Sequence, residues 1–196
     1  MTLRLEDLAT RRSVPNMQLE APGPDAATLA RILQTAVRVP DHGKLVPFRF
    51  VTIDGDARAL LSEAMAAHHA AVEPDVAEKV LEKDRLRYTF APLIVTVIGR
   101  EVEHAKVPGI EQILSAGCVA FQLLQAAQAE GFGACWLTGW AAYDRGVMDW
   151  FEMTDDEAII GFIHIGTPKL DVPERERPDA MSLVTPLDVS RLPGAV

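Results

Sequence analysis

The feature that most constrains the fold is a short apolar run at 93–98, which reads Leu-Ile-Val-Thr-Val-Ile. It lies between Pro92 and Gly99, two residues that interrupt regular structure. A continuous apolar run of this length is typical of a central strand that is covered on both faces. We therefore expect a sheet with helices packed on each side.

The rest of the chain supplies such helices and further strands. Asp25 is a suitable N-cap for the helix that follows it, and Pro40 stops that helix. Helices and strands alternate loosely, which indicates an α/β or α+β class with one sheet. Sequence patterns predict helices at about 3–11, 25–38, 57–72, 75–89, 110–129 and 145–151, and strands at 48–53, 133–138 and 159–165.

Length and tail composition suggest a single domain with an arm. The chain has 196 residues, 48% of them hydrophobic, which suits one compact domain over 1–196. From about residue 169 the sequence is rich in charge and proline and has no helical period, so 169–196 is expected to be an extended C-terminal arm. Residues 181–186 have the composition of an edge strand. Such an arm often packs on a neighbour, which indicates an oligomer.

Charge and cysteine usage exclude several classes of protein. With 19 basic and 28 acidic side chains the net charge is −9, which repels a nucleic-acid backbone. Cys118 and Cys135 form neither a disulfide framework nor a zinc spacing, so we expect no metal site. We find no signal-peptide core and no apolar run long enough to span a membrane. A cytoplasmic protein without a nucleic-acid or membrane partner fits best.

The histidines and glycines have simple structural interpretations. Gly131-Phe132-Gly133 resembles part of a dinucleotide fingerprint, but a helix precedes it and a strand follows, so a helix C-cap is the better interpretation. His68 and His69 diverge by about a quarter turn on a predicted helix, so we expect surface histidines and no shared metal. Asp41-His42 has the residue types of a catalytic pair, although a satisfied loop histidine is the simpler interpretation.

Arg11-Arg12-Ser13, at the end of the first predicted helix, has two interpretations. Two guanidinium groups and a hydroxyl can hold a phosphate, because arginine matches its oxygens bidentately. Cations at a helix C-terminus can also simply complement the helix dipole. The three residues alone do not decide between these roles.

The order of several short motifs along the chain adds a resemblance. Arg11-Arg12-Ser13 is followed by 38–42 (Arg-Val-Pro-Asp-His), 47–51 (Pro-Phe-Arg-Phe-Val), 116–118 (Ala-Gly-Cys), 130–136 (Glu-Gly-Phe-Gly-Ala-Cys-Trp) and 159–168. In this order, from about residue 5 to 170, the chain resembles the nitroreductase family of FMN-dependent oxidoreductases. It is most similar to the YdjA-like branch of small bacterial members with a Pro-Asp-His motif.

The resemblance implies a fold, partners and a set of binding residues. The implied fold is α+β, with a mixed central sheet covered by helices on both faces, in a homodimer with two FMN sites at the subunit interface. By similarity, FMN would contact Arg11, Arg12, Ser13, Trp136, Leu137 and Thr138, with Arg38 and His42 reaching it from the other subunit. NADH or NADPH would lie beside Glu130, Gly131, Phe132, Gly133, Ala134 and Cys135.

The implied reaction is reduction of nitroaromatic, quinone or similar small acceptors by NADH or NADPH. Flavin N5 would carry the hydride, so no side chain is assigned as catalytic. Because only one cofactor-binding constellation is visible, we expect a ping-pong mechanism. A flavin-binding or sensing protein without efficient turnover, or a plain dimeric scaffold, remain alternatives.

Three positions depart from the family pattern. Lys44 stands where an amide often contacts the flavin ring, Pro15 replaces a lysine that often follows the Arg-x-Ser, and Leu137 replaces an arginine common in this branch. These departures bear on the preference for substrate and nicotinamide cofactor.

Overall fold

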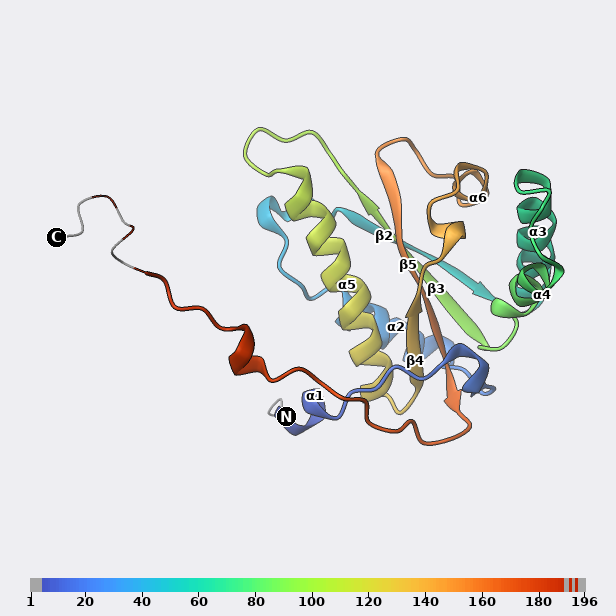
Figure 1. The fold of residues 1–196 in the computed structure, drawn as a ribbon, viewed down its shortest axis with the longest axis horizontal. Coiled ribbons are helices and arrows are strands. Elements are labelled where there is room, and N and C mark those ends of the chain that lie inside the picture. Colours follow the sequence, from blue (N-terminus) through green and yellow to red (C-terminus); the bar gives the residue numbers. More distant parts are fainter. Residues whose placement is uncertain (1–4, 189–190, 192, 194–196) are drawn as a thin grey trace.

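The computed structural model describes residues 5–188, 191 and 193, so the predicted start of the first helix at 3 lies outside the described residues. An antiparallel sheet forms the centre of the fold and helices cover it (Figure 1). The elements, in chain order, are α1 (Leu5–Ala9), η1 (Asn16–Gln18), β1 (Leu19–Glu20), α2 (Ala26–Ala36), η2 (His42–Lys44), β2 (Phe48–Asp54), α3 (Ala57–Val72), α4 (Glu78–Arg87), β3 (Leu93–Arg100), α5 (Gly109–Ala129), β4 (Gly133–Leu137), η3 (Trp140–Ala142), α6 (Arg145–Trp150), β5 (Glu157–Pro168) and η4 (Ala180–Leu183).

The predicted central strand is confirmed. Strand β3 is buried from Leu93 to Gly99 and pairs with β2 on one side and β5 on the other. Strand β5 also pairs with β4 and, at its end, with β1. The sheet order is therefore β1-β5-β3-β2, with β4 beside β5.

The sheet was expected to be mixed, but its pairings among the described strands are all antiparallel. The connections explain this. The helical pair α3–α4 returns the chain to the end at which β2 finished, so Asp54 faces Leu93 and β3 runs back along β2. Helix α5 returns the chain to the end of the sheet at which β3 began, so β4 runs in the same direction as β3. Strand β5 lies between β3 and β4 and is antiparallel to both. The α+β class is confirmed.

Alternate residues of β3 enter two different cores. Val95 and Val97 pack with α2 and α5 on one face of the sheet. Ile94 and Ile98 pack with Met65 of α3, and with η3 and α6, on the other face. The expectation of helices on both faces is therefore confirmed, because a strand buried on both sides needs two covering layers.

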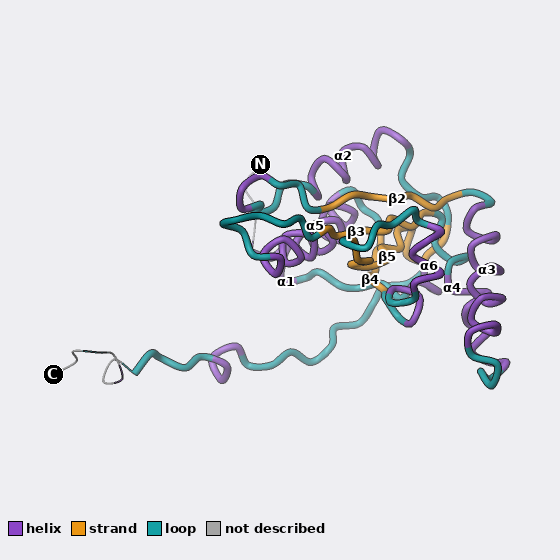
Figure 2. Tube along the Cα trace, turned by 90° about the horizontal axis from the view of Figure 1, so that it is seen from above, coloured by secondary structure: helices purple, strands orange, loops and turns teal. Residues whose placement is uncertain are grey.

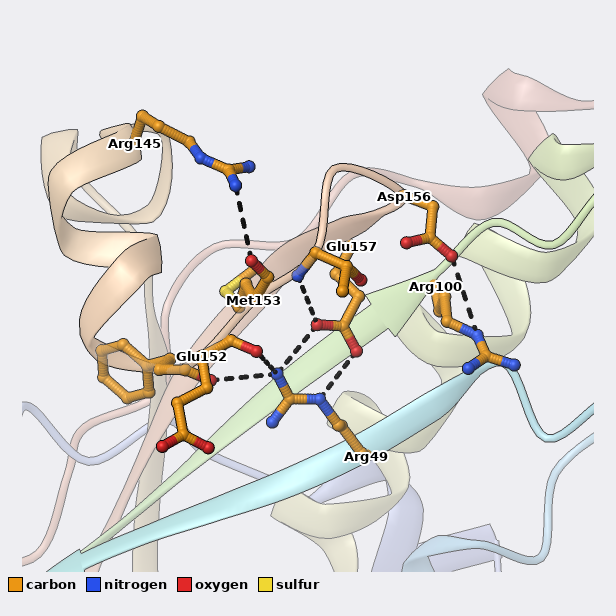
Figure 3. Close-up of polar contacts among 9 residues, drawn as sticks. Arg49, Arg100, Arg145, Glu152, Met153, Asp156 and Glu157 are labelled. Atoms are coloured by element: carbon orange, nitrogen blue, oxygen red, sulfur yellow. Dashed lines mark hydrogen bonds and ion pairs between the residues drawn. The ribbon is translucent and has the colours of Figure 1, made fainter.

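Arg49 ties the edge strand β2 to the beginning of β5 (Figure 3). Its guanidinium group donates to both carboxylate oxygens of Glu157, at 2.7 and 2.8 Å, and to the carbonyl oxygen of Phe151 at 3.0 Å. The hydrogen bonds from Arg49 hold the pKa of Glu157 below its usual range.

Helix boundaries follow the sequence closely where a cap is present. Asp25 Oδ1 accepts the Thr28 N–H at 2.7 Å, as predicted for an N-cap. Helix α2 nevertheless ends at Ala36, and α4 begins at Glu78 and not at 75, where no side-chain cap holds the first turn. Helix α5 is long and apolar enough to cross a membrane by length and composition, but half of the relevant window is buried inside the protein. It is a core helix.

The C-terminal arm leaves the body after β5 (Figures 1 and 2). The Lys169 N–H donates to the Gln18 carbonyl at 2.9 Å, and Glu174 pairs with Arg12. Residues 181–186 do not form the expected edge strand: within 5–188 they pair with no strand, and Ala180–Leu183 is a 3₁₀ turn. Asp179 stabilises this turn by accepting the Met181 N–H at 3.0 Å.

Candidate functional site

The N-terminal segment from Arg11 to Asn16 lies beside strand β4. Val14 N–H donates to the Ala134 carbonyl at 3.0 Å, and the Val14 side chain is buried with Leu19 and Cys135. A Cβ on Gly133 would lie within 3.0 Å of the Leu19 and Val14 side chains, so this close approach needs glycine there. The packing of Val14 therefore fixes the position of the predicted phosphate-binding residues.

Arg11 and Arg12 have different surroundings. The Arg11 guanidinium group donates to Ser13 Oγ at 3.2 Å and lies 5.9 Å from the centre of the Phe121 ring. Arg12 donates to the Ala9 carbonyl at the end of α1, at 3.3 Å, and pairs with Glu174 of the arm. Arg12 thus satisfies the helix end, while Arg11 and Ser13 face outward together.

A cluster of cations surrounds Arg11. Partial burial lowers its pKa below the usual value. Further positive charges also lower this pKa, namely those of Arg177, Arg175 and Arg12. Cations that repel one another in this way are stabilised by a bound anion. Sequence inspection missed Arg175 and Arg177, because only the path of the arm brings them near Arg11.

A cavity of about 460 Å³ lies at the end of β4, on the side away from α5. Asn16 Nδ2 donates to the Arg87 carbonyl at 2.9 Å, and Arg87 Nη1 donates to the Thr138 carbonyl at 3.3 Å. Gly139 has φ +85°, and a Cβ there would lie 2.8 Å from Arg87 Nη1. The cavity is lined by Asn16, Met17, Lys79, Glu82, Lys83, Leu86, Arg87, Phe90 and Leu137.

Strand alternation separates the predicted residues of β4. The Leu137 side chain lines the cavity, and the Thr138 backbone lies at its edge through Arg87. Trp136 points to the opposite face, where its Nε1 donates to the Ile160 carbonyl at 3.0 Å and its indole covers Gly161. Arg87 is a cation at this site that sequence inspection did not identify.

Arg38 and His42 lie elsewhere in the chain. Arg38 lines a shallow hollow of about 380 Å³ on the outer face of α5, together with Phe121. His42 Nδ1 is 2.7 Å from Glu111 Oε2 at the start of α5. From Glu111 to Phe121, which Arg11 contacts, the helix rises about 15 Å. One chain therefore does not bring His42 to its own Arg11.

Asp41 and His42 do not form a catalytic pair. The Asp41 carboxylate accepts the Leu45 and Val46 N–H groups at 3.0 and 2.9 Å, so it caps the loop that contains Lys44. The preferred interpretation of a satisfied loop histidine holds for His42, whose partner is Glu111.

The segment 130–135, predicted to lie beside the nicotinamide, begins exposed and ends buried. Two hydrogen bonds from Arg31, at 2.9 and 2.8 Å, lower the pKa of Glu130. Gly131 has φ +87°, and the Phe132 N–H donates to the Ala127 carbonyl, which confirms the helix C-cap. Gly133, Ala134 and Cys135 are buried, and burial raises the pKa of the Cys135 thiol to about 12. Nicotinamide binding here stays a prediction.

The histidines of α3 correct an expectation. His69 is 6% exposed, and its Nδ1 is 2.6 Å from Asp84 Oδ2, which also accepts the Trp140 Nε1–H at 3.1 Å. His68 Nε2 is 2.7 Å from Asp144 Oδ1 and is half-buried. They are not surface residues, because α4, η3 and α6 cover this side of α3 and supply the carboxylates.

Comparison with known proteins identifies the family. Residues 8–167 match the model described as the nitroreductase family. The chain belongs to the nitroreductase family. The family resemblance expected from the motif order is therefore confirmed.

This nitroreductase-family chain is similar to curated bacterial relatives. It is 38% identical over 170 residues to a provisionally named NAD(P)H nitroreductase of Haemophilus influenzae, covering 86% of this chain and 90% of the relative. It is 36% identical over 166 residues to the provisionally named NAD(P)H nitroreductase YdjA of Escherichia coli, covering 85% and 88%. A provisionally named nitroreductase from Desulfovibrio desulfuricans, solved in complex with FMN, has the same fold, with a TM-score of 0.73, 18% identity and coverage of 95% and 98%.

Proposed function

We propose that this protein is an FMN-dependent oxidoreductase that uses NADH or NADPH to reduce nitroaromatic, quinone or similar small acceptors. One observation carries the proposal: the segment from Arg11 to Asn16 joins a cluster of cations to a 460 Å³ cavity. Five residues of extended chain reach about 17 Å, which suits a ligand with a phosphate at one end and a ring system at the other. The names of the curated relatives and the FMN-bound neighbour support the same function.

The cation cluster fits the phosphate of FMN. Arg11 and Ser13 face outward side by side, and the charges of Arg175 and Arg177 lie close enough to lower the pKa of Arg11. A dianionic phosphate would replace this repulsion by charge-assisted hydrogen bonds. Arg12 contributes by holding the arm through Glu174, which also pairs with Arg177 at 3.3 Å and so keeps this part of the arm near Arg11.

The cavity fits a flavin ring. Its volume and its apolar wall of Met17, Leu86, Phe90 and Leu137 suit a planar aromatic system. When bound, FMN supplies the redox chemistry, accepting a hydride at N5 from NAD(P)H and passing it to the acceptor. Arg87, held over Thr138, would place a positive charge beside the ring and favour the negative charge of the reduced form. This cation would supply a polar contact to the ring, a role that the resemblance assigns to an amide where this chain has Lys44.

Use of this one cavity by both substrates would give a ping-pong mechanism. Because NAD(P)H and the acceptor would use the same face of the ring in turn, the first product must leave before the second substrate enters. Parallel double-reciprocal lines are expected in steady-state kinetics. Intersecting lines would require both substrates to be bound together and would contradict the shared cavity.

We further propose a homodimer in which two chains complete each site. The outer face of α5 exposes Ile110, Leu114 and Phe121, which are 64%, 61% and 45% exposed. These residues recur at helical spacing and would be covered by a second copy. Arg38 lines the same face, and His42 lies at its beginning, so both would reach the FMN of the other copy.

The cytoplasm is the proposed location, because Cys118 and Cys135 are both free thiols and a reducing compartment keeps them so.

Absorption spectroscopy tests the enzyme proposal. Purified protein should be yellow with bound FMN, and anaerobic NADH or NADPH should bleach the colour. A colourless protein that takes up no added FMN would refute flavin binding. A yellow protein that neither nucleotide bleaches would instead indicate a flavin-binding or sensing protein.

Substitution of Arg11 tests the phosphate assignment. Each lost charge-assisted hydrogen bond weakens binding by about 1.5–3 kcal/mol, or on the order of 10- to 100-fold in affinity. Arg11→Ala should therefore lose FMN on dialysis, while Lys106→Ala, an exposed lysine of the linker, should retain it. Unchanged FMN content in Arg11→Ala would show that Arg11 only complements α1.

Mixed dimers test the shared site. A dimer of one Arg11→Ala chain and one Arg38→Ala chain would have one site with both changes and one intact site. Isolated mixed dimers should hold about half of the wild-type FMN. If they stay as empty as the parents, both residues serve one site within a chain.

A further inference from the structure

The wall of the cavity formed by α4 has a distinctive charge. Lys79, Lys83 and Arg87 all line the cavity and follow one another at intervals of four residues, so they lie on one face of the helix. The stripe they form is about 12 Å long. On a chain with a net charge of −9, this is a local basic surface.

The two lysines of this stripe are available to a ligand. In the described part of the chain Lys79 and Lys83 form no ion pair, whereas Arg85, which does not line the cavity, pairs with Glu78 at 2.6 Å. Glu82 is the one acid among the residues that line the cavity as described, so the lining has a net charge of +2. Such a surface attracts an anion.

The inner and outer ends of the stripe differ. Arg87 lies at the inner end, where it contacts Thr138 beside the proposed flavin position. Lys83 is about 6 Å further out along the helix and Lys79 about 12 Å. The apolar side chains of Met17, Leu86 and Phe90 line the same cavity, so an acceptor ring stacked on the proposed flavin would lie beside the same apolar wall.

We propose that the acceptors preferred by this enzyme are aromatic compounds with an acidic group, such as a carboxylate. This inference rests on the proposed function of the same cavity. The reducible group would lie at the inner end near Arg87 and the carboxylate at the outer end near Lys83 and Lys79. For a nitro group the step is ArNO2 + NAD(P)H + H⁺ → ArNO + NAD(P)⁺ + H2O, which conserves atoms and transfers two electrons.

Kinetics with a charged and a neutral acceptor test the proposal. The pair is 4-nitrobenzoate and 4-nitrobenzamide, which have similar shapes and differ in charge. Exposed charge pairs contribute modestly, so each lysine should account for about threefold in kcat/KM and both together for about tenfold. Lys79→Gln with Lys83→Gln should therefore lower kcat/KM for nitrobenzoate about tenfold and change that for nitrobenzamide less than twofold.

Glu82→Gln is a matched variant of opposite sign on the same helix. Removing this acid should raise kcat/KM for nitrobenzoate about threefold without affecting nitrobenzamide. Lys106→Gln, an exposed lysine outside the cavity, should change neither. The effects of the α4 variants should shrink with added salt, because salt screens exposed charges.

Three results would overturn the inference. Equal losses of kcat/KM for both acceptors would indicate that the substitutions disturb the structure of α4. Unchanged kcat/KM for both acceptors would show that the two lysines do not contact the acceptor. A loss confined to the anaerobic reduction rate by NADH or NADPH would assign the stripe to the nucleotide phosphates. A purified protein that is colourless, or whose colour neither nucleotide bleaches, would refute the proposed function itself. An active enzyme in which the Lys79 and Lys83 substitutions affect both acceptors alike would refute only this inference.

Discussion

Loss of the Asp84 side chain should destabilise the fold strongly. It is 3% exposed, and its Oδ2 lies 2.6 Å from His69 Nδ1 and 3.1 Å from Trp140 Nε1. The carboxylate thus joins α4 to α3 and to η3. Asp84→Ala would leave two buried polar groups without their acceptor.

The expected cost follows from these contacts. An unsatisfied buried polar group costs about 1–3 kcal/mol, and Asp84→Ala would leave two of them, His69 Nδ1 and Trp140 Nε1. We therefore expect Asp84→Ala to lower the free energy of unfolding by about 2–6 kcal/mol. Asp84→Asn, which preserves shape and one carbonyl oxygen, should cost less than Asp84→Ala.

Urea denaturation followed by circular dichroism measures this difference. Variants should be compared at one protein concentration, because the stability of a dimer depends on concentration. Asp75→Ala is the control, since Asp75 is exposed and lies between the same two helices. An Asp84→Ala free energy within 1 kcal/mol of the wild-type value, at an unchanged urea dependence, would refute the reasoning.

Loss of Asp84 should also be visible at the cavity. Lys83 and Arg87 are on the same helix, one before Asp84 and three after it. If the carboxylate sets the position of α4, Asp84→Asn should retain FMN less well than wild type even under conditions in which it is fully folded. Equal FMN retention would limit Asp84 to a role in stability.

Three further predictions concern the sheet and its strands. The hydrogen bonds from Arg49 lower the pKa of Glu157, so the stabilising contribution of Glu157 is present above the unfolded-state pKa and is lost as the pH falls through the folded-state pKa. The difference in unfolding free energy between wild type and Glu157→Gln, measured by urea titration, should therefore shrink toward acidic pH. A difference that does not depend on pH would contradict this. Gly161→Ala would place a methyl group against the Trp136 indole and should lower the unfolding free energy by about 1–3 kcal/mol, as measured by thermal melting. Trp136→Ala should remove this clash, so the double variant should lose less stability than the sum of the two single variants. Additive losses would argue against the contact. Burial raises the pKa of the Cys135 thiol to about 12. In a Cys118→Ser variant, Cys135 should therefore not react with a thiol reagent at neutral pH until denaturant is added. Rapid labelling of the folded protein would show that β4 opens.

Local sequence was sufficient for the elements with strong patterns. The apolar run at 93–98 identified β3, the bounds predicted for 57–72 match α3, and the Asp25 cap lies where the sequence placed it. These features depend on residues within a few positions of one another. The order of the motifs was sufficient for the family.

The site could be predicted only in part, because tertiary packing decides it. Arg87 reaches Thr138 from 51 positions away, and the arm carries Arg175 and Arg177 back to Arg11. Nothing local distinguishes Lys83 from any exposed helix lysine. Likewise, His69 reads as a surface residue until α4 is known to supply Asp84.

The pairing of β5 with three other strands has a consequence for synthesis on the ribosome. Strands β3 and β4 are made earlier but do not pair with each other, and each waits for β5 as its shared neighbour. Until about residue 168 has left the exit tunnel, the nascent chain holds two-stranded β2–β3 pairing at most, and the part of the α5 apolar face that packs against β5 stays uncovered. Nascent chains arrested before Glu157 should therefore remain protease-sensitive and engage chaperones, and the sheet should close in one late event.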